Sequence, residues 1–317
     1  MSNEKIRIGI SSCLLGEKVR FDGQHKLDRF IVNTLGVYFD FVPVCPEVEL
    51  GLPTPRPALR QVGEPDAPRL VFSKTGEDIS EAMEAWSQRR VRALETDELC
   101  GFIFKKGSPS SGMERVKLYD HHGIPQKSGV GFFARAFMAY FPLLPVEEDG
   151  RLNDPKLREN FITRVFTLQR LRQALAEKNS YGAVVDFHTR HKYLILSHSE
   201  KHYREMGRLV AQSKALPFST FLAQYNELLQ AALHLSTTVR KQVNVLQHIL
   251  GYFKRELSSA EKQEALGLID DYRNDLVPLI VPITLLNHFV LKYDQPYLKQ
   301  QLYLNPHPRE LKLLNHV

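Results

Sequence analysis

The sequence IRIGISSCLLG, residues 6–16, joins a short apolar run to a loop of small residues that contains Cys13. The run Ile6–Ile10 has the length and composition of a buried β-strand. A second apolar run, Phe41–Val44, likewise ends at a cysteine, Cys45. Thiolates at the ends of separate strands suit a shared iron–sulfur cluster. A structural zinc site is a poorer fit, because the chain has no C-x-x-C pair.

Strand and helix patterns alternate in the N-terminal half of the chain. The runs Ile6–Ile10, Phe39–Val44 and Gly101–Lys105 are predicted strands, and a helix with Asp78 and Glu81 as its capping box lies between the last two. This alternation predicts an α/β domain with a mostly parallel, Rossmann-like sheet. Functional loops then belong at the carboxyl ends of the strands, where both cysteines fall.

The C-terminal half is predicted to be all-helical. The proline-rich stretch 142–155 reads as a linker or a domain boundary, and we place the domains at residues 1–150 and 151–317. The clearest helix is predicted over 239–257, where apolar residues recur at spacings of three and four. Its opposite face carries polar, cationic and aromatic residues, namely Lys241, Asn244, His248, Tyr252 and Arg255, with Lys254 adjacent.

Composition and charge indicate where the protein is located and what kind of partner it binds. The N-terminus lacks the apolar stretch of a signal peptide and the longest apolar segment is too short to span a membrane, so we expect a cytoplasmic protein. Three cysteines argue against a disulfide scaffold. Residues 151–317 hold 23 Lys and Arg against 15 Asp and Glu, whereas residues 1–150 hold 19 against 21. This asymmetry predicts that the C-terminal half meets a polyanion.

Three separated motifs in residues 5–145 resemble the thiouracil desulfidase family. They are the Cys13 loop with Val-Arg-Phe-Asp-Gly at 19–23, the segment 44–56 around Cys45, and Lys-Gly-Ser-Pro-Ser-Ser-Gly at 106–112. Residues 180–317 resemble the helical domain found fused to it, with motifs at 186–192, 244–254 and 277–282. The two-domain arrangement looks like that of the bacterial tRNA 4-thiouridine desulfidases.

This resemblance implies a reaction and a cofactor. The reaction is non-redox desulfuration of 4-thiouridine in tRNA to uridine, with a [4Fe-4S] cluster that has three protein ligands and one open iron. It assigns cluster ligation to Cys13, Cys45 and the position of Ser111, and catalytic roles to Glu47 and Ser108. On sequence alone, Glu47 also reads as a surface carboxylate and Ser108 as a turn serine.

Serine stands where the family has its third cysteine. A hydroxyl is a hard, weakly acidic ligand and replaces a thiolate on iron poorly. Either the chain has lost an intact cluster, or Ser111 is an engineered substitution meant to trap an inactive state, or Cys100 serves as the third ligand. We favour Cys100 as a core residue, because it precedes the strand 101–105 and is expected at the opposite end of the sheet.

Substrate contacts are expected in both domains. Arg20 and Ser110 are predicted near the cysteine loops, although Arg20 also reads as an ordinary ion pair with Asp22. The histidines at 188, 191, 198 and 202 are expected on one helical face, open to metal, RNA or purely structural roles. The RNA-binding candidates in the helical half are Arg190, His191, Lys192, Lys241, Asn244, His248, Tyr252, Lys254 and Arg255.

Two other functions stay open from the sequence. One is desulfuration of free thiouracil or a thionucleoside, and the other is a cluster-free RNA-binding protein, which Ser111 makes plausible. A nicotinamide cofactor is not expected, because Ser128–Gly131 has only two glycines of the dinucleotide fingerprint. The oligomeric state is not predicted.

Overall fold

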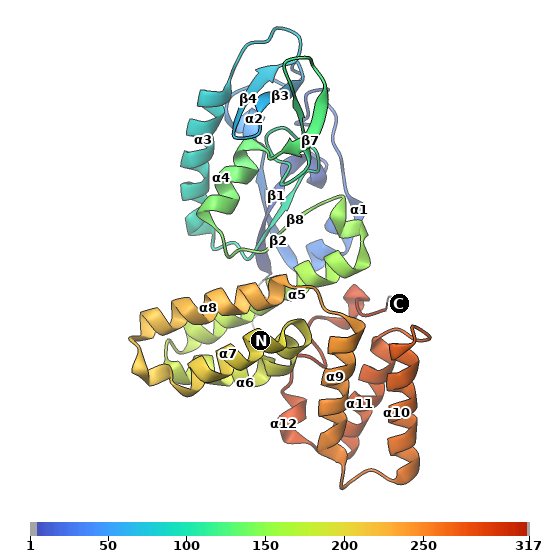
Figure 1. The fold of residues 1–317 in the computed structure, drawn as a ribbon. Helices are drawn as coiled ribbons and strands as arrows, with labels where there is room; N and C mark the ends of the chain where they lie inside the picture. The colour runs from blue at the N-terminus through green and yellow to red at the C-terminus, as the bar shows by residue number, and fades with distance from the viewer. Residues whose placement is uncertain (1–4, 316–317) are drawn as a thin grey trace. The chain divides into compact units, whose positions relative to one another are not determined.

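The chain divides into two compact units, residues 1–154 and 155–317, in a computed structural model that describes residues 5–315. The first unit is built around strands and the second entirely from helices (Figure 1). This confirms the predicted fold class. Among the described residues, no helix combines the length and the apolar character that a membrane span requires.

A parallel four-stranded sheet forms the centre of the first unit. Its strands are β1 (Ile6–Ser11), β2 (Phe39–Val44), β5 (Phe102–Phe104) and β8 (Val146–Glu148), in the order β2-β1-β5-β8. Every pairing in this sheet is parallel. The predicted strands are therefore confirmed, and the loops after β1, β2 and β5 leave the sheet at the same edge.

A second sheet of four strands was not predicted from the sequence. It consists of β3 (Leu59–Glu64), β4 (Ala67–Phe72), β6 (Val116–Tyr119) and β7 (Pro125–Gly129), in the order β4-β3-β6-β7. β3 pairs parallel with β6, and the two outer pairings are antiparallel. These strands carry many charged and exposed residues, so their apolar runs are too short to stand out.

Within its described residues, the first unit also has the α-helices α1 (Arg29–Asn33), α2 (Pro46–Glu49), α3 (Ser80–Ala93) and α4 (Phe132–Tyr140). The predicted capping box of α3 does not form. Asp78 accepts a hydrogen bond from the Ser80 amide at 2.8 Å with one oxygen and pairs with Arg69 through the other. The helix begins one residue later than the box requires, so Glu81 is not its reciprocal partner.

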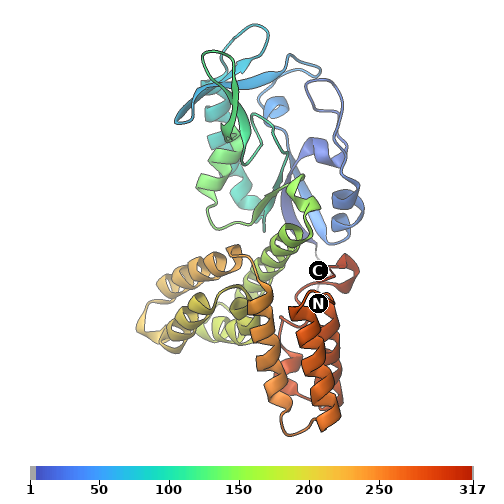
Figure 2. The same cartoon turned by 45° about the vertical axis from the view of Figure 1, so that its right-hand side comes forward.

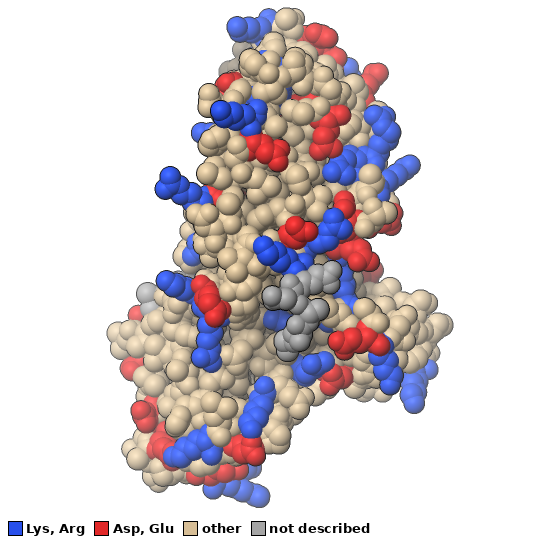
Figure 3. All heavy atoms as spheres, turned by 180° about the vertical axis from the view of Figure 1, so that it is seen from behind, with Lys and Arg blue, Asp and Glu red and all other residues tan. Residues whose placement is uncertain are grey.

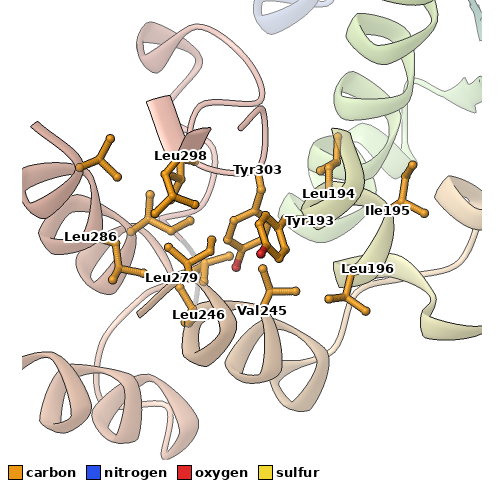
Figure 4. Close-up of a cluster of buried hydrophobic side chains, with 14 of the residues drawn as sticks. Tyr193, Leu194, Ile195, Leu196, Val245, Leu246, Leu279, Leu286, Leu298 and Tyr303 are labelled. Atoms are coloured by element: carbon orange, nitrogen blue, oxygen red, sulfur yellow. The ribbon is translucent and has the colours of Figure 1, made fainter. Parts of the chain in front are cut away.

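The second unit is a helical domain. Its helices are α5 (Pro155–Glu177), α6 (Tyr181–His198), α7 (Glu200–Ala211), α8 (Phe218–His234), α9 (Val239–Leu250), α10 (Ser259–Arg273), α11 (Ile280–Lys292) and α12 (Pro296–Lys299). Figure 2 shows them from a second angle. Tyr193 of α6, Leu246 of α9 and Leu298 of α12 meet in one buried cluster (Figure 4). Burial of these apolar faces stabilises the unit.

Two predicted helices are shorter than the sequence pattern indicated. The helix predicted to run to residue 257 ends at Leu250 and continues only as a 3₁₀ turn, Gly251–Phe253. The predicted histidine face is divided between two helices, because α6 ends at His198 and Ser199 caps α7 by accepting from the His202 amide at 3.3 Å. Ser199 begins a new helix at its N-cap, and the spacing of the histidines therefore does not place them on one helix.

Candidate active site

Three loops at one edge of the parallel sheet line a cavity of about 300 Å³. Cys13 comes from the loop after β1, Cys45 and Glu47 from the loop after β2, and Ser108 and Ser111 from the loop after β5. Residues more than 60 positions apart in the sequence thus meet because parallel strands end together. The structure brings the predicted ligand and catalytic residues into one site.

The Cys13 loop is shaped by a 3₁₀ turn, Ser12–Leu15. Gly16 ends this turn with φ of +97°, a left-handed conformation that glycine adopts without steric cost. The Cys13 carbonyl accepts a hydrogen bond from the Lys26 amide at 2.9 Å. The loop is therefore fixed on both sides of a buried thiol.

Cys45 precedes the short helix α2, and its amide donates to Glu49 at 3.0 Å. Its Sγ lies 3.7 Å from Oε2 of Glu47. Burial raises the pKa of the Cys45 thiol to about 12 and that of Cys13 to about 11, so both are protonated at neutral pH until a metal displaces the proton.

Glu47 is held by a chain of hydroxyls. Ser110 is completely buried and donates to Oε1 of Glu47 at 2.7 Å. Oγ of Ser108 lies 3.0 Å from Oγ of Ser110 and accepts from the Ser111 amide at 3.1 Å. Ser110 lies behind the cavity wall, so the structure gives it the role of orienting Glu47 and Ser108 instead of the substrate contact expected from the sequence.

Arg56 is a residue of this site that the sequence reasoning missed. Its side chain is 4% exposed, and its guanidinium lies 3.7 Å from Oε2 of Glu47. It also donates to the Val19 carbonyl at 3.0 Å and to Thr54 Oγ1 at 3.2 Å. Arg56 is the last residue of the 44–56 motif, and its place in that motif is the feature of the sequence that could have identified it. The cation balances Glu47 and fixes the loop that carries it.

A second cation, Lys105, reaches the cavity from the end of β5. Its Nζ pairs with Asp149 at 2.9 Å. Arg20 also lines the cavity and pairs with Asp22 at 3.3 Å. The lining of the cavity therefore has four arginine or lysine side chains, because Lys106 also belongs to it, beside one carboxylate, Glu47.

The loop that contains Ser111 packs tightly against the start of α4. The Gly131 amide donates to Gly112 at 2.7 Å, and the Phe133 amide donates to the Ser110 carbonyl at 2.9 Å. A Cβ at Gly131 would lie 2.5 Å from the Ser110 carbonyl carbon. These amides position the loop, so they are not available to bind a base carbonyl or a phosphate.

Two of the three predicted ligand positions carry a side chain whose donor atom suits iron. Cys13 and Cys45 are soft ligands on one cavity, and the buried Ser111 presents a hydroxyl at the third loop. Cys100 lies at the other edge of the sheet, where its amide donates to Arg7 at 2.8 Å, as predicted for a core cysteine. Within residues 5–315, no group of three His, Cys, Asp or Glu side chains is arranged to hold a metal.

The predicted RNA contacts of the helical domain separate into buried and exposed residues. His191 is 2% exposed and its Nδ1 donates to the Phe187 carbonyl, so its ring does not reach the surface. Lys241 donates to the carbonyls of His198 and Ser236 and caps helix ends. Arg190 is paired with Asp186, and Lys192 lies over the Tyr193 and Tyr297 rings. The exposed candidates are Asn244, His248, Tyr252, Lys254 and Arg255.

The histidines at 188 and 198 are also interior residues. Burial lowers the pKa of both to about 4, so they are neutral at pH 7. Nδ1 of His198 donates to the Leu235 carbonyl at 2.7 Å. For His188, His191 and His198, the structure favours the structural role among the alternatives.

Comparison with known proteins finds a matching protein family for each unit. Residues 8–149 match the model of the family described as 2-thiouracil desulfurase. Residues 192–308 match a protein family of unknown function, DUF1722. The uncharacterized protein YbgA of Escherichia coli (strain K12) is 30% identical over 163 residues, which are 51% of this chain and 96% of YbgA. The solved [4Fe-4S]-dependent thiouracil desulfidase TudS is 27% identical, covering 47% of this chain and 95% of that one, with a TM-score of 0.38.

The chain thus joins a thiouracil desulfurase-type α/β domain to a helical domain of the DUF1722 type. With a relative that is 30% identical along nearly its whole length, the chain belongs to the family of YbgA.

Proposed function

We propose that this chain removes sulfur from a thiolated uracil base, and that its substrate is 4-thiouridine in tRNA. The observation that carries the proposal is the convergence of Cys13, Cys45 and Glu47 on one cavity, with Ser108 in its wall. The desulfurase-type match supports the reaction class. The excess of Lys and Arg in residues 151–317 supports a polyanionic substrate.

Cys13 and Cys45 would hold a [4Fe-4S] cluster, with Ser111 at the third position. When bound, a cluster with one iron free of protein ligands supplies a Lewis acid for the thiocarbonyl sulfur. Because Ser111 offers a hydroxyl where a thiolate binds iron better, we expect the chain to hold the cluster weakly.

The protein's own groups handle water and protons. The oxygen of a water molecule forms a bond to the carbon that bears the sulfur, the carbon–sulfur bond breaks, and sulfur leaves as sulfide. The balance needs no oxidant or reductant. Glu47 takes the proton from water and returns one to the leaving sulfur, with Ser110 fixing its Oε1 and Ser108 at the cavity wall orienting the base.

A base in RNA reaches this cavity only if it leaves its stack. Extrusion costs a few kcal/mol, which contacts elsewhere on the RNA must offset. In the helical domain, Tyr252 is 37% exposed, and its ring stacks on Tyr297 with centroids 5.5 Å apart. Lys254 and Arg255 are exposed beside it. Figure 3 shows Lys and Arg interspersed with Asp and Glu on the face in view.

The test is anaerobic reconstitution of the full chain and of its Ser111→Cys variant with iron and sulfide, followed by a sulfide-release assay on 4-thiouridine-containing tRNA. We expect a stable cluster and turnover in the variant and little in the parent chain. If neither protein holds iron, the cluster is excluded. Turnover on free 2-thiouracil that matches turnover on tRNA, with a KM for tRNA indifferent to salt, would favour the free base as substrate.

Ser111 itself favours one alternative, a cluster-free RNA-binding protein. That alternative predicts tight tRNA binding and no sulfide release even after Ser111→Cys. Restored turnover in this variant excludes it.

A further inference from the structure

An aromatic ring stands exposed at the rim of the active-site cavity. Phe21 is 44% exposed and lines the cavity mouth. Its turn is rigid, because Gly23 has φ of +71° and its amide donates to the Arg20 carbonyl at 2.9 Å. The Phe21 carbonyl accepts from the Arg56 amide at 2.9 Å. The backbone therefore holds a large apolar side chain in water, where burial would be favourable.

Cations accompany this ring. The Arg20 guanidinium lies 5.6 Å from the centre of the Phe21 ring and pairs with Asp22 at 3.3 Å, so a phosphate would compete with this exposed carboxylate. Lys106, on the loop after β5, is exposed and lines the same cavity. A flat apolar ring beside cationic groups matches a nucleotide, whose base stacks on aromatic rings while its phosphate pairs with cations.

The ring lies outside the place where the reacting base must go. Cys13 and Cys45 are the ligand positions, and both thiols are largely buried. A base that reacts beside them occupies the interior, so a ring at the exposed rim meets what lies next along the strand. We infer that Phe21 stacks on the base of the nucleotide adjacent to the target, and that Arg20 pairs with the phosphate between them. This inference rests on the proposed function and concerns how the site recognises a polymer.

Binding to the cluster-free full chain tests the inference without turnover. The probes are uridine monophosphate and the dinucleotide uridylyl-uridine, measured by NMR titration. Phe21→Ala should weaken dinucleotide binding on the order of tenfold and change mononucleotide binding less than about twofold. The matched control is Ile124→Ala, which removes a 58% exposed apolar side chain outside the cavity lining and should change neither.

A fluorescence measurement supplies the second readout. The chain has a single tryptophan, Trp86, which is 7% exposed. The dinucleotide should quench the added emission in Phe21→Trp and leave that of Ile124→Trp unchanged. Equal quenching in both, or equal losses of mononucleotide and dinucleotide binding in Phe21→Ala, would overturn the inference.

Failure of this inference is separable from failure of the proposed function. Sulfide release from free 2-thiouracil by the reconstituted Ser111→Cys variant, together with no dinucleotide preference, overturns only the role of Phe21. A preference for the dinucleotide that Phe21→Ala abolishes, with no sulfide release from any substrate, supports the rim site and overturns the desulfidase proposal.

Discussion

Replacing Ser110 by alanine tests how the Glu47 carboxylate is held. The Ser110 hydroxyl is fully buried and donates to Oε1 of Glu47 at 2.7 Å, while Ser108 loses its hydroxyl partner at 3.0 Å in the same change. A hydrogen bond to a charged group contributes about 1.5–3 kcal/mol. The expected loss of unfolding free energy for Ser110→Ala is therefore about 2 kcal/mol, in the first unit of the chain.

Urea unfolding followed by Trp86 fluorescence measures this loss, because Trp86 lies in α3 of that unit. Ser87→Ala is the matched control. Ser87 is also fully buried, but its hydroxyl has no hydrogen-bond partner within the described part of the chain. Removing it should change stability by less than about 0.5 kcal/mol. If Ser110→Ala costs no more than Ser87→Ala, the hydroxyl chain does not hold Glu47.

Further predictions concern packing, RNA binding and pH. Gly131→Ala forces a Cβ against the backbone of Ser110 and should cost about 1–3 kcal/mol in the same urea assay, with unaltered stability refuting the close contact. Replacing Lys254 and Arg255 by glutamine should reduce the slope of log K for tRNA against log salt by about 2; an unchanged slope removes them from the interface. Burial raises the pKa of Glu159 to about 7 from its usual 4.5, so its contribution to stability is full below pH 4.5 and is lost as the pH rises through 7. In Glu159→Gln, the thermal midpoint by circular dichroism should vary less over this range than in the parent, and an identical profile would exclude the effect.

The parallel sheet and the loops at its edge could be predicted from the sequence. Strands such as Ile6–Ser11 are buried on nearly every residue, so their apolar runs are visible without partners. The position of Cys100 followed from the same logic, since it precedes its strand and the other two cysteines follow theirs. Direction along a parallel strand is enough to place a residue at one edge or the other.

Side-chain partners within the site could not be predicted in the same way. Arg56 touches Glu47 because a turn brings residues nine positions apart face to face, and no periodicity encodes that contact. The hydrogen bonds of Lys241 could not be predicted either, because they depend on tertiary packing. A lysine on a polar helix face is bonded only if backbone carbonyls of other segments lie within reach, as those of His198 and Ser236 do here. His191 lay on a pattern compatible with exposure, yet the neighbouring elements cover it.

The distribution of the proposed cluster ligands over the loops after three strands has a consequence for the order of folding and metal binding. Cys13, Cys45 and Ser111 are far apart along the chain and become neighbours only when β1, β2 and β5 have paired. An unfolded chain offers no local chelate, unlike a zinc finger in which metal drives folding. The sheet must therefore assemble first, by its own hydrophobic burial. On the proposed function, iron would then bind in a cavity that is already folded.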